Sequence, residues 1–449
     1  MTYLKTKEIL NQVQDALERD DIDHAIQILL ALKPADQADV FEELDDKDQA
    51  SLLPSLSPEV SADILENIED EEAADLAANL PDETLARIVD EMEPDEAADL
   101  LGDIHPDQAQ AVLARLENPE EVRPLLLHPD ESAGGLMTSE FLALRRRMTV
   151  DEAIQAVRAW QPDNENIYYL YVVDGQNHLC GVVSLRDLIV ANPNELLMNI
   201  MEPDVISVKV GVDQEYCAEL MSHYDLLALP VVNEENQLVG VITIDDVIDV
   251  VVEEATEDIQ KLGGAQPLGE PYLLTKPVSI FKKRIGWLLM LFLTESLTGT
   301  VLRHFEDELQ AVVALAFFVP LLIGTGGNAG SQTTSTIIRA LAVGEMRVWD
   351  ALQAIWHETR VGLLLGAGMA VVAYLRALSW GSSSELALTV ALAILTIVVW
   401  ANLLGAILPT LAMRLKIDPT VVSGPVMSTL VDATGLFIYF TIAKMTLGI

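Results

Sequence analysis

Cysteine is scarce in this chain of 449 residues, which contains only Cys180 and Cys217. Two cysteines cannot build the disulfide framework of a small secreted domain, so the sequence predicts a reducing compartment. The opening residues MTYLKTKEIL also lack an apolar stretch as long as the centre of a secretory signal. We therefore expect the first part of the chain to stay in the cytosol.

Positive charge is scarce as well, with 27 Lys and Arg against 70 Asp and Glu and a net charge of −43. Because no basic stripe exists, the sequence argues against nucleic acid as a partner. The imbalance is confined to residues 1–270, which contain 60 acidic and 15 basic residues, whereas residues 271–449 contain 10 and 12. Such an acidic surface either serves solubility or carries self-repulsion that bound multivalent cations reduce.

Charged residues almost disappear from the long apolar runs that follow Ile285. Runs of this length can cross about 30 Å of hydrocarbon. They predict five membrane spans, at residues 285–302, 310–340, 361–378, 386–413 and 420–443.

The basic residues of the short loops indicate how these spans are oriented. Those before the first span, between the second and third and between the fourth and fifth belong on the cytosolic side, and they are Lys282, Lys283, Arg284, Arg347, Arg360, Arg414 and Lys416. Lys444, near the opposite end, is a mild exception. The sequence predicts a multi-pass protein of the cell membrane with a cytoplasmic N-terminus.

Two predicted spans contain residues that disturb helices. The second span includes Gly324-Thr-Gly-Gly-Asn-Ala-Gly-Ser-Gln332, whose backbone cannot face lipid without hydrogen-bond partners. We predict an interruption that lines water, while a close helix crossing through small residues is the alternative. The polar side chains of Asn328 and Gln332 favour the interruption that lines water. In the fifth span, Pro425 predicts a lost helical hydrogen bond and a free carbonyl.

Asp432 lies at the middle of the otherwise uncharged fifth span. A carboxylate there is unfavourable unless it faces water, a cation or a basic partner, and no Lys or Arg lies at comparable depth in the other spans. The sequence favours a cation pathway over a protonated Asp. Neighbouring oxygen donors suit Mg²⁺, and one Asp per chain predicts a dimer around the pore. Glu295, in the first span, either joins the pore or accepts a hydrogen bond from a neighbouring helix.

The first 130 residues show repeated helix starts in which a proline precedes an acid. Proline suits the first helical position and acids stabilise the first turn. The starts recur at about 12 or 24 residues, which predicts a superhelical stack of helix pairs, and they are at Pro34, Pro58, Pro81, Pro94 and Pro106. Asp95 and Asp99 share one helix face, which is either a solvated surface or a ligand surface.

An internal repeat occupies residues 137–255, where residues 170–187 align with 229–246 at an offset of 59. Each copy predicts strand, turn, strand and helix, with Ser184 or Thr243 as the helix cap. The following helix carries self-repelling acids, which favours bound counterions, at positions 246, 249, 253, 254, 257 and 258. Because EF-hand spacing is absent, their ligand partners would have to come from other segments.

The motif G-h-h-[ST]-x-x-D, where h is apolar, occurs at 181–187 and 240–246 and resembles a tandem pair of CBS domains. The resemblance implies an adenine nucleotide such as ATP, with Ser184 and Asp187 on the ribose and Tyr169 and Arg186 as neighbours for base and phosphate. In the second copy the adjacent Asp245 and Asp246 are unfavourable for a phosphate because they would repel its negative charge. A nucleotide-free, structural pair remains the alternative.

Taken together, the chain resembles the MgtE-type magnesium channels over essentially its full length. The motifs that carry this resemblance are Ser132-Ala-Gly-Gly-Leu-Met-Thr138, Glu254-Ala-Thr-Glu-Asp258, Gly326-Gly-Asn-Ala-Gly-Ser-Gln332, Ser423-Gly-Pro425 and Asp432-Ala-Thr-Gly435. The expected fold is multidomain: an all-α superhelical domain (1–130), an α/β tandem CBS pair (131–252), a connecting amphipathic helix (253–280) and a five-helix transmembrane domain (281–449).

The resemblance implies a homodimer that holds Mg²⁺ near Asp432, with Asn328 and the backbone around Gly424 and Gly435 contributing. Some family members carry Asn where this chain has Gly424, which leaves only a backbone carbonyl there. The resemblance also implies regulatory Mg²⁺ sites, for which the candidate ligands are Asp95, Asp99, Glu215, Asp225, Asp246, Asp249, Glu254, Glu257, Asp258 and Asp418.

The predicted function is a Mg²⁺-selective channel or transporter that cytosolic Mg²⁺ closes. No nucleophile and base occur in a catalytic pattern, so we do not expect an enzyme. One alternative is a proton- or sodium-coupled carrier of divalent cations with Asp432 as proton carrier, because broken helices would suit it equally. Another is a membrane-tethered energy sensor that passes a nucleotide signal to a protein partner.

Overall fold

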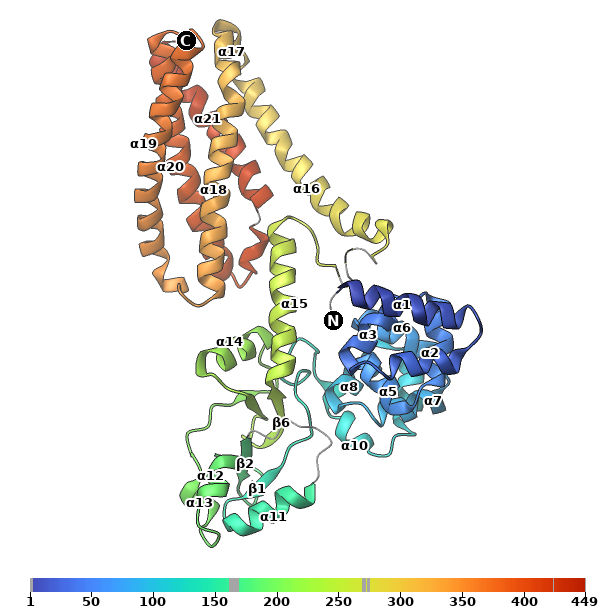
Figure 1. Ribbon diagram of the computed structural model, residues 1–449. Coiled ribbons are helices and arrows are strands. Elements are labelled where there is room, and N and C mark those ends of the chain that lie inside the picture. The colour runs from blue at the N-terminus through green and yellow to red at the C-terminus, as the bar shows by residue number, and fades with distance from the viewer. Residues whose placement is uncertain (1–2, 161–168, 269–271, 273–274, 423, 449) are drawn as a thin grey trace. The chain divides into compact units, whose positions relative to one another are not determined.

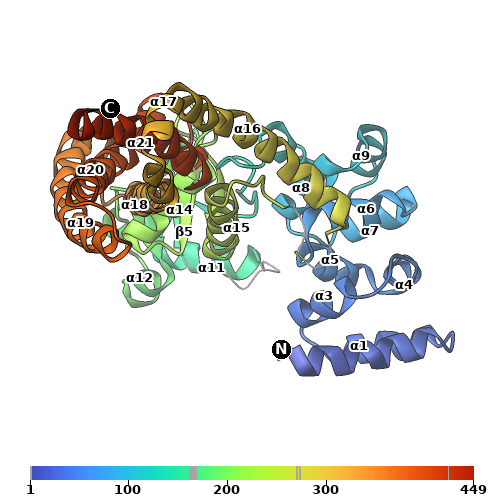
Figure 2. The ribbon, with the colours of Figure 1, turned by 90° about the horizontal axis from the view of Figure 1, so that it is seen from above.

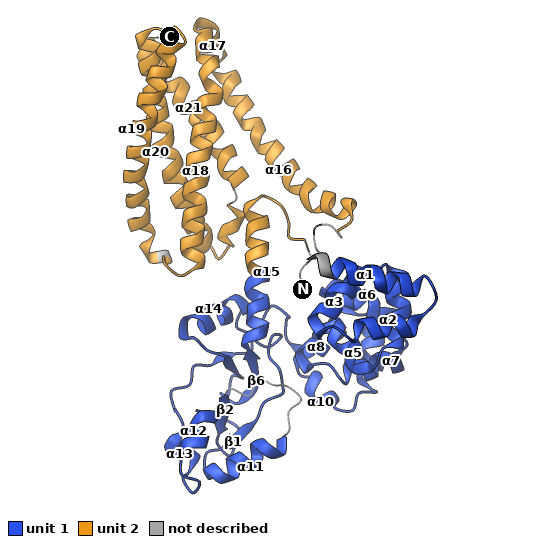
Figure 3. Ribbon diagram, in the orientation of Figure 1, with its two compact units in different colours: residues 1–252 blue, residues 253–449 orange. Residues whose placement is uncertain are grey.

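The computed structural model describes residues 3–160, 169–268, 272, 275–422 and 424–448. Ser423, part of one motif above, lies outside the described residues. The chain forms two compact units, residues 1–252 and 253–449 (Figure 3). Each unit is described by itself.

The first part of unit 1 is a stack of short helices. They are α1 (Tyr3–Leu17), α2 (Ile22–Leu29), α3 (Pro34–Glu42), α4 (Asp46–Leu52), η1 (Leu53–Ser55), α5 (Pro58–Glu66), α6 (Asp70–Ala78), α7 (Asp82–Val89), α8 (Pro94–Asp103), α9 (Pro106–Leu113), α10 (Pro119–Val122) and η2 (Leu125–Leu127). Alternate helices pack together, α3 on α5, α5 on α7 and α7 on α9, so the predicted stack is confirmed (Figure 2).

Proline marks the helix starts as the sequence predicted. Four of the predicted prolines, at 34, 58, 94 and 106, occupy the first helical position, where a missing N–H breaks no hydrogen bond. Pro81 instead directly precedes α7. The apolar faces behind these starts form one buried core that includes Phe41, Leu85 and Leu101.

The second part of unit 1 contains two similar three-stranded sheets, ordered β1-β2-β3 and β4-β5-β6. Its elements are β1 (Ala143–Arg145), α11 (Val150–Trp160), β2 (Tyr169–Val173), β3 (Leu179–Ser184), α12 (Leu185–Val190), α13 (Leu197–Ile200), β4 (Val208–Lys209), α14 (Gln214–Tyr224), β5 (Ala228–Val232), β6 (Leu238–Thr243) and the first part of α15 (Ile244–Leu262), which continues into unit 2. The predicted repeat of strand, turn, strand and helix is therefore confirmed.

The two repeats join through their hairpin turns. Leu179 N–H donates to Asn236 O at 3.1 Å, and Leu238 N–H donates to Asn177 O at 3.0 Å. Both bonds connect equivalent positions of the two copies, because 179 and 238, like 177 and 236, differ by the repeat offset. The two repeats therefore contact each other through equivalent positions in a locally two-fold manner.

Unit 2 is helical, and within its described residues five helices are long and apolar enough to cross a membrane (Figure 1). Its elements are α16 (Pro277–His304), α17 (Glu306–Ala311), η3 (Val313–Phe318), α18 (Val319–Ala342), η4 (Val348–Asp350), α19 (Ala351–Ser379), α20 (Ser384–Arg414), η5 (Pro419–Val421) and α21 (Gly424–Leu447). α20 packs against α18, α19 and α21, while α16 packs along α21.

The predicted interruption of the second span is wrong. Residues 324–332 lie inside the continuous helix α18, and their glycines form the close helix crossing that was the alternative. A Cβ at Gly326 would lie 2.6 Å from Ile397 and 2.8 Å from Val431, and one at Gly330 would lie 2.8 Å from Met427. Small residues therefore let α18 approach α20 and α21.

The expected break at Pro425 is also absent. Helix α21 begins at Gly424, which places Pro425 in the first turn, where no intrahelical hydrogen bond is lost. The carbonyl of Gly424 is not free either, since it accepts a hydrogen bond from Ser331 Oγ at 3.3 Å.

Candidate functional site

Acidic side chains gather inside unit 1 around α8. Asp95 is only 5% exposed, and its Oδ1 has no hydrogen-bond partner among the described residues. Asp246, at the start of α15, acts electrostatically on Asp95, Glu96 and Asp99. The structure therefore brings together three of the predicted ligands, Asp95, Asp99 and Asp246.

The pKa values of these acids are raised because burial penalises their charged forms and neighbouring carboxylates add repulsion. The pKa of Asp95 lies well above its ordinary value through burial and then Asp246. Burial and the charge of Asp99 raise the pKa of Glu96 to about 9. The pKa of Asp99 rises to about 7 through burial, Asp130 and Asp70. For Asp246 burial raises the pKa to about 6, although Thr243 donates a hydrogen bond that opposes the shift.

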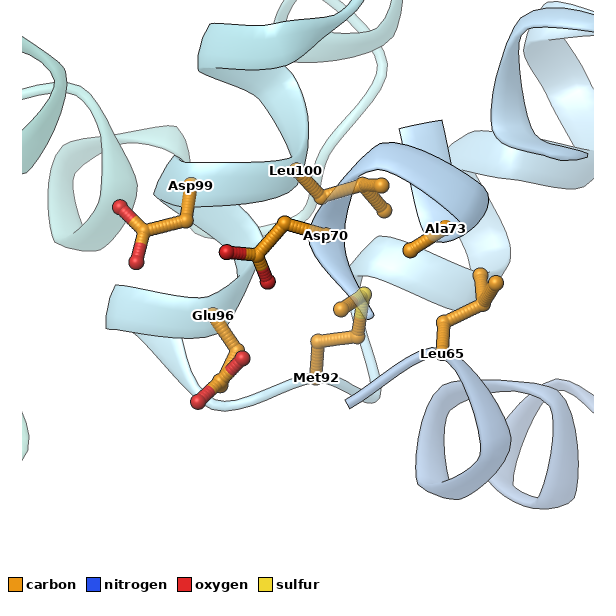
Figure 4. Close-up of a pocket in the computed structure, with 7 residues that line it drawn as sticks. All are labelled: Leu65, Asp70, Ala73, Met92, Glu96, Asp99 and Leu100. Atoms are coloured by element: carbon orange, nitrogen blue, oxygen red, sulfur yellow. The ribbon is translucent and has the colours of Figure 1, made fainter. Parts of the chain in front are cut away.

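A small pocket opens between α6 and α8 beside these acids. Figure 4 shows the carboxylates of Asp70, Glu96 and Asp99 at one end and apolar side chains at the other. The lining residues are Leu65, Asp70, Ala73, Met92, Glu96, Asp99 and Leu100. Three acids and no basic residue line this pocket, so its charge is uncompensated by the lining.

The donor chemistry of this acidic cluster fits a hard cation, because carboxylate oxygens are the ligands that Mg²⁺ and Ca²⁺ prefer. Asp95 Oδ1, which accepts no hydrogen bond from the described residues, is a further oxygen that a cation or its water would contact. Across the described residues, however, no three acidic, His or Cys side chains already converge tightly enough to hold a metal ion. The negative charge of the cluster attracts cations, although its carboxylates do not yet converge on one ion.

The raised pKa values predict how the stability of unit 1 changes with pH. Each acid binds its proton more tightly in the folded state than in the unfolded chain. Folding is therefore most favoured below the ordinary values near 4, and stability falls as pH rises through about 6 to 9. Without divalent ions, we expect the Tm of a fragment of residues 1–262 to drop by about 5 °C between pH 5 and pH 8.

Differential scanning fluorimetry measures this change. The double variant Asp99→Asn, Asp246→Asn is the control, because it removes two of the titrating groups and should flatten the profile. Millimolar Mg²⁺ should raise the Tm of the wild-type fragment at pH 8 back to its value at pH 5. A Tm that stays constant or rises over this range would contradict the assignment of unpaired buried acids.

The remaining predicted ligands of unit 1 lie apart from this cluster or at its edge. Glu215 and Asp225 stand at opposite ends of α14, where Asp225 adopts a left-handed conformation as the C-cap. Ten helical residues span about 15 Å, so a single ion cannot contact both within one chain. Asp249 is exposed on α15, and partial desolvation followed by the charge of Asp245 raises its pKa.

The predicted ligands of unit 2 outside the membrane helices meet at the end of α15. Burial, then Asp418 and Glu254, raise the pKa of Asp258. Although burial opposes it, hydrogen bonds from Thr420 and Lys261 hold the pKa of Asp418 below its ordinary value. Lys261 pairs with both Asp418, at 2.9 Å, and Glu257. The sequence reasoning did not foresee this lysine.

The predicted nucleotide residues of the first repeat lie together. Tyr169 pairs across the strands with Ser184. Ser184 caps α12: its Oγ accepts from Asp187 N–H at 3.1 Å and donates to Asp187 Oδ2 at 2.6 Å. Arg186 lies exposed on the same turn. Hydroxyl, carboxylate, guanidinium and aromatic groups thus share one end of β2 and β3, which suits a nucleotide.

In the membrane unit, Asp432 is half-buried on α21. Among the described residues, none donates a hydrogen bond to its carboxylate, and no Lys or Arg pairs with it. Glu295 of α16 is near enough for its charge to act on Asp432, and it too receives no hydrogen bond from the described residues. The predicted alternative for Glu295, a hydrogen bond to a neighbouring helix, does not occur among them.

Asn328 is exposed on α18. Its neighbour Gly327 meets Ser428 of α21, where a Cβ would lie 3.1 Å from the Ser428 hydroxyl. Asn328 is therefore level with Ser428, one helical turn before Asp432. Gly435 is instead buried against Ile397, where it allows α21 to pack closely on α20.

One polar cluster of unit 2 was missed by the sequence reasoning. Glu358 of α19, 13% exposed at its side chain, accepts hydrogen bonds from Thr333 Oγ1 at 3.2 Å and Asn402 Nδ2 at 3.3 Å. His357 Nδ1 lies 3.6 Å from its other oxygen. The third span was predicted to begin at residue 361, whereas α19 begins at Ala351, so Glu358 lies outside the predicted span.

Models of known families match most of this chain. The model described as the MgtE intracellular N domain matches residues 32–131, and the CBS domain model matches residues 133–193 and 197–253. The MgtE model, described as a divalent cation transporter, matches residues 319–442. These matches follow the order of parts that the sequence predicted.

Curated relatives are similar over most of their length. The magnesium transporter MgtE of Thermus thermophilus is 46% identical over 327 residues, which is 73% of this chain and 72% of that protein. The magnesium transporter MgtE of Bacillus subtilis is 37% identical over 323 residues, 72% of this chain and 71% of that protein.

A solved structure is similar to the soluble part. It is described as the cytosolic domain of the Mg²⁺ channel MgtE in complex with ATP, and it is 39% identical with a TM-score of 0.51. The alignment covers 54% of this chain and 99% of that structure.

Proposed function

Because the chain belongs to the MgtE family of magnesium transporters, we propose that it is a Mg²⁺-selective channel which cytosolic Mg²⁺ closes. It is a multi-pass membrane protein with a cytoplasmic N-terminal part, and it is a transporter and not an enzyme. The observation that carries the proposed pathway is Asp432, a carboxylate within a membrane helix that no described residue neutralises. A passing cation compensates such a charge.

The proposed pathway uses oxygen donors suited to a hydrated ion. Mg²⁺ loses water reluctantly and takes one or two carboxylates. We assign these to Asp432 of each subunit in a homodimer, with Asn328 one turn away as a neutral ligand for the water shell. Gly435 and Gly424 contribute backbone only, and Glu295 adds negative potential near the ion.

The proposed sensor is the set of unneutralised acids of the cytoplasmic part. At high cytosolic Mg²⁺ the ions bridge carboxylates such as Asp95, Asp99 and Asp246 and compact the soluble part. At low Mg²⁺ the buried acids repel one another and the compact form becomes unfavourable. The ion closes the channel only because it binds the compact state more tightly. Further ligands in this proposal are Glu215, Asp225, Asp249, Glu254, Glu257, Asp258 and Asp418.

We further propose that the first CBS repeat binds ATP. Tyr169, Ser184, Arg186 and Asp187 lie together there, and the similar cytosolic domain of known structure is a complex with ATP. Ser184→Ala should weaken ATP binding about ten-fold in calorimetry, because the hydroxyl positions Asp187. Thr243→Ala, the matched change in the second repeat, should leave the affinity unchanged, and equal losses in both variants would contradict this placement.

Electrical recording of the purified protein in planar bilayers tests the channel proposal. We expect a Mg²⁺ current that is ohmic, independent of a proton or sodium gradient and reduced when Mg²⁺ is added on the cytoplasmic side. A strict dependence of flux on either gradient would instead establish coupled transport. A current that cytoplasmic Mg²⁺ never reduces would refute the sensor.

A further inference from the structure

Lys261, on the last turn of α15, lies between two carboxylates that were predicted to bind a regulatory cation. Its Nζ is 2.9 Å from Asp418 Oδ2, and it also pairs with Glu257 one helical turn earlier. The three side chains are about one-third exposed. The ammonium therefore lies at a half-buried position where a metal ion bridging Glu257 and Asp418 would have to bind.

Asp418 is held in one orientation by its own loop. Its Oδ1 accepts hydrogen bonds from Thr420 N–H at 2.8 Å and Thr420 Oγ1 at 2.6 Å. Only Oδ2 is turned toward Lys261. Because Thr420 fixes the carboxylate, an incoming ion cannot obtain Oδ2 by simple rotation of Asp418 and competes directly with the ammonium.

One lysine does not balance the acids around it. The pKa of Asp258 is raised by burial, Asp418 and Glu254, and Lys261 offsets this only in part. Lys261 thus pairs with two carboxylates, Glu257 and Asp418, and its charge also acts on a third, Asp258. A lysine ammonium is a compact, strongly hydrated charge with three donors, and it joins two carboxylates as a hydrated cation would, but with one charge instead of two.

We infer that Lys261 is a tethered competitor of the regulatory cation, which it replaces between Glu257 and Asp418 when the ion is absent. A divalent ion must displace the ammonium before it bridges these carboxylates. The lysine thereby raises the Mg²⁺ concentration at which the channel closes. This inference rests on the proposed function, because it concerns the regulation of the proposed sensor.

The size of the effect follows from the exposure of the pair. Partly exposed ion pairs are weak, so removing the competitor should change the apparent affinity only a few-fold. We expect Lys261→Gln to lower the Mg²⁺ concentration for half-maximal protection by about three-fold. Lys261→Arg keeps the charge and should stay near the wild type.

Protease protection of the full-length protein in detergent, titrated with Mg²⁺, measures this midpoint without relying on transport. Chymotrypsin is the suitable protease, because trypsin would lose a cleavage site in the variant. Lys282→Gln is the matched control: it removes one lysine near the same membrane face that has no ion pair among the described residues. Lys261→Met serves as a second variant if the glutamine protein is poorly folded.

The outcomes separate this inference from the proposed function. If the wild type shows no Mg²⁺-dependent protection, the proposed sensor itself fails. If the wild type responds but Lys261→Gln has the same midpoint, only the competitor role is wrong. A midpoint that rises in Lys261→Gln would also overturn it and would identify the lysine as a clamp that favours the closed form.

Discussion

Replacing Asp432 by asparagine is expected to reduce Mg²⁺ flux by about two orders of magnitude, equivalent to about 2.7 kcal/mol in the stabilisation of the ion. The substitution keeps the shape of the side chain and removes its charge. Since no described residue neutralises Asp432, the passing ion is its proposed counter-charge. A neutral amide attracts a hydrated divalent ion far less, while removing an unpaired carboxylate from a membrane helix does not destabilise the fold.

Mg²⁺ uptake into proteoliposomes that contain a magnesium-sensitive dye measures this loss. Glu295→Gln is the matched control, because Glu295 is the other acid whose charge acts here, and it is exposed on α16. Its loss should reduce flux only a few-fold, through the weaker local potential. If vesicles with Asp432→Asn carry Mg²⁺ at the wild-type rate while the protein remains folded, Asp432 is not on the pathway.

The features that the sequence predicted well depend on neighbouring residues. Proline at helix starts acts within one turn, so positions 34, 58, 94 and 106 could be placed without knowing the tertiary structure. The repeat was equally visible, because strand, turn and cap recur at a fixed offset. The five long apolar segments also predicted the five long apolar helices found in the described residues.

The glycine-rich segment shows where local reasoning failed. Gly326, Gly327 and Gly330 reduce helix propensity, which suggested a break. Propensity was overridden because α18 packs against α20 and α21, and contacts with Ile397 and Met427 require residues without a side chain. The sequence contains these glycines but not the identity of the helices that approach them.

The surroundings of the candidate ligands could be predicted only in part for the same reason. The spacing of Asp95 and Asp99 predicted a shared helix face, and only the family resemblance suggested them as ligands. Glu96 lies on the same helix, whereas Asp70 joins them only through the packing of α6 on α8. Lys261 and Asp418 are 157 residues apart in sequence. Nothing local predicts that this lysine neutralises that acid, although a basic residue at the end of an acidic helix was a signal worth testing.

The combined substitution of Asp246, Asp249, Glu254 and Glu257 by their amides should leave a channel that stays open at high cytosolic Mg²⁺. These acids lie on α15, where Asp246 faces the buried acids of α8 and Glu257 reaches the group around Asp418. Amides remove the charge that binds the ion, and without bound Mg²⁺ nothing bridges the acidic segments into the closed form. They also remove some of the repulsion that favours opening, but the loss of ion binding dominates in this prediction. Closure should then require at least about ten-fold more Mg²⁺, a loss of about 1.4 kcal/mol in ion binding.

Bilayer currents recorded against cytoplasmic Mg²⁺ decide this prediction, and a second quadruple variant controls for net charge. Changing Glu8, Asp15, Glu18 and Asp23 to their amides removes the same number of acids from exposed positions on α1, on α2 and in the turn between them. If both variants shift closure alike, only overall charge matters. If neither shifts it, the sensor lies elsewhere. A shift confined to the α15 variant would mean that placement governs gating, because screened charges act over only about 8–10 Å.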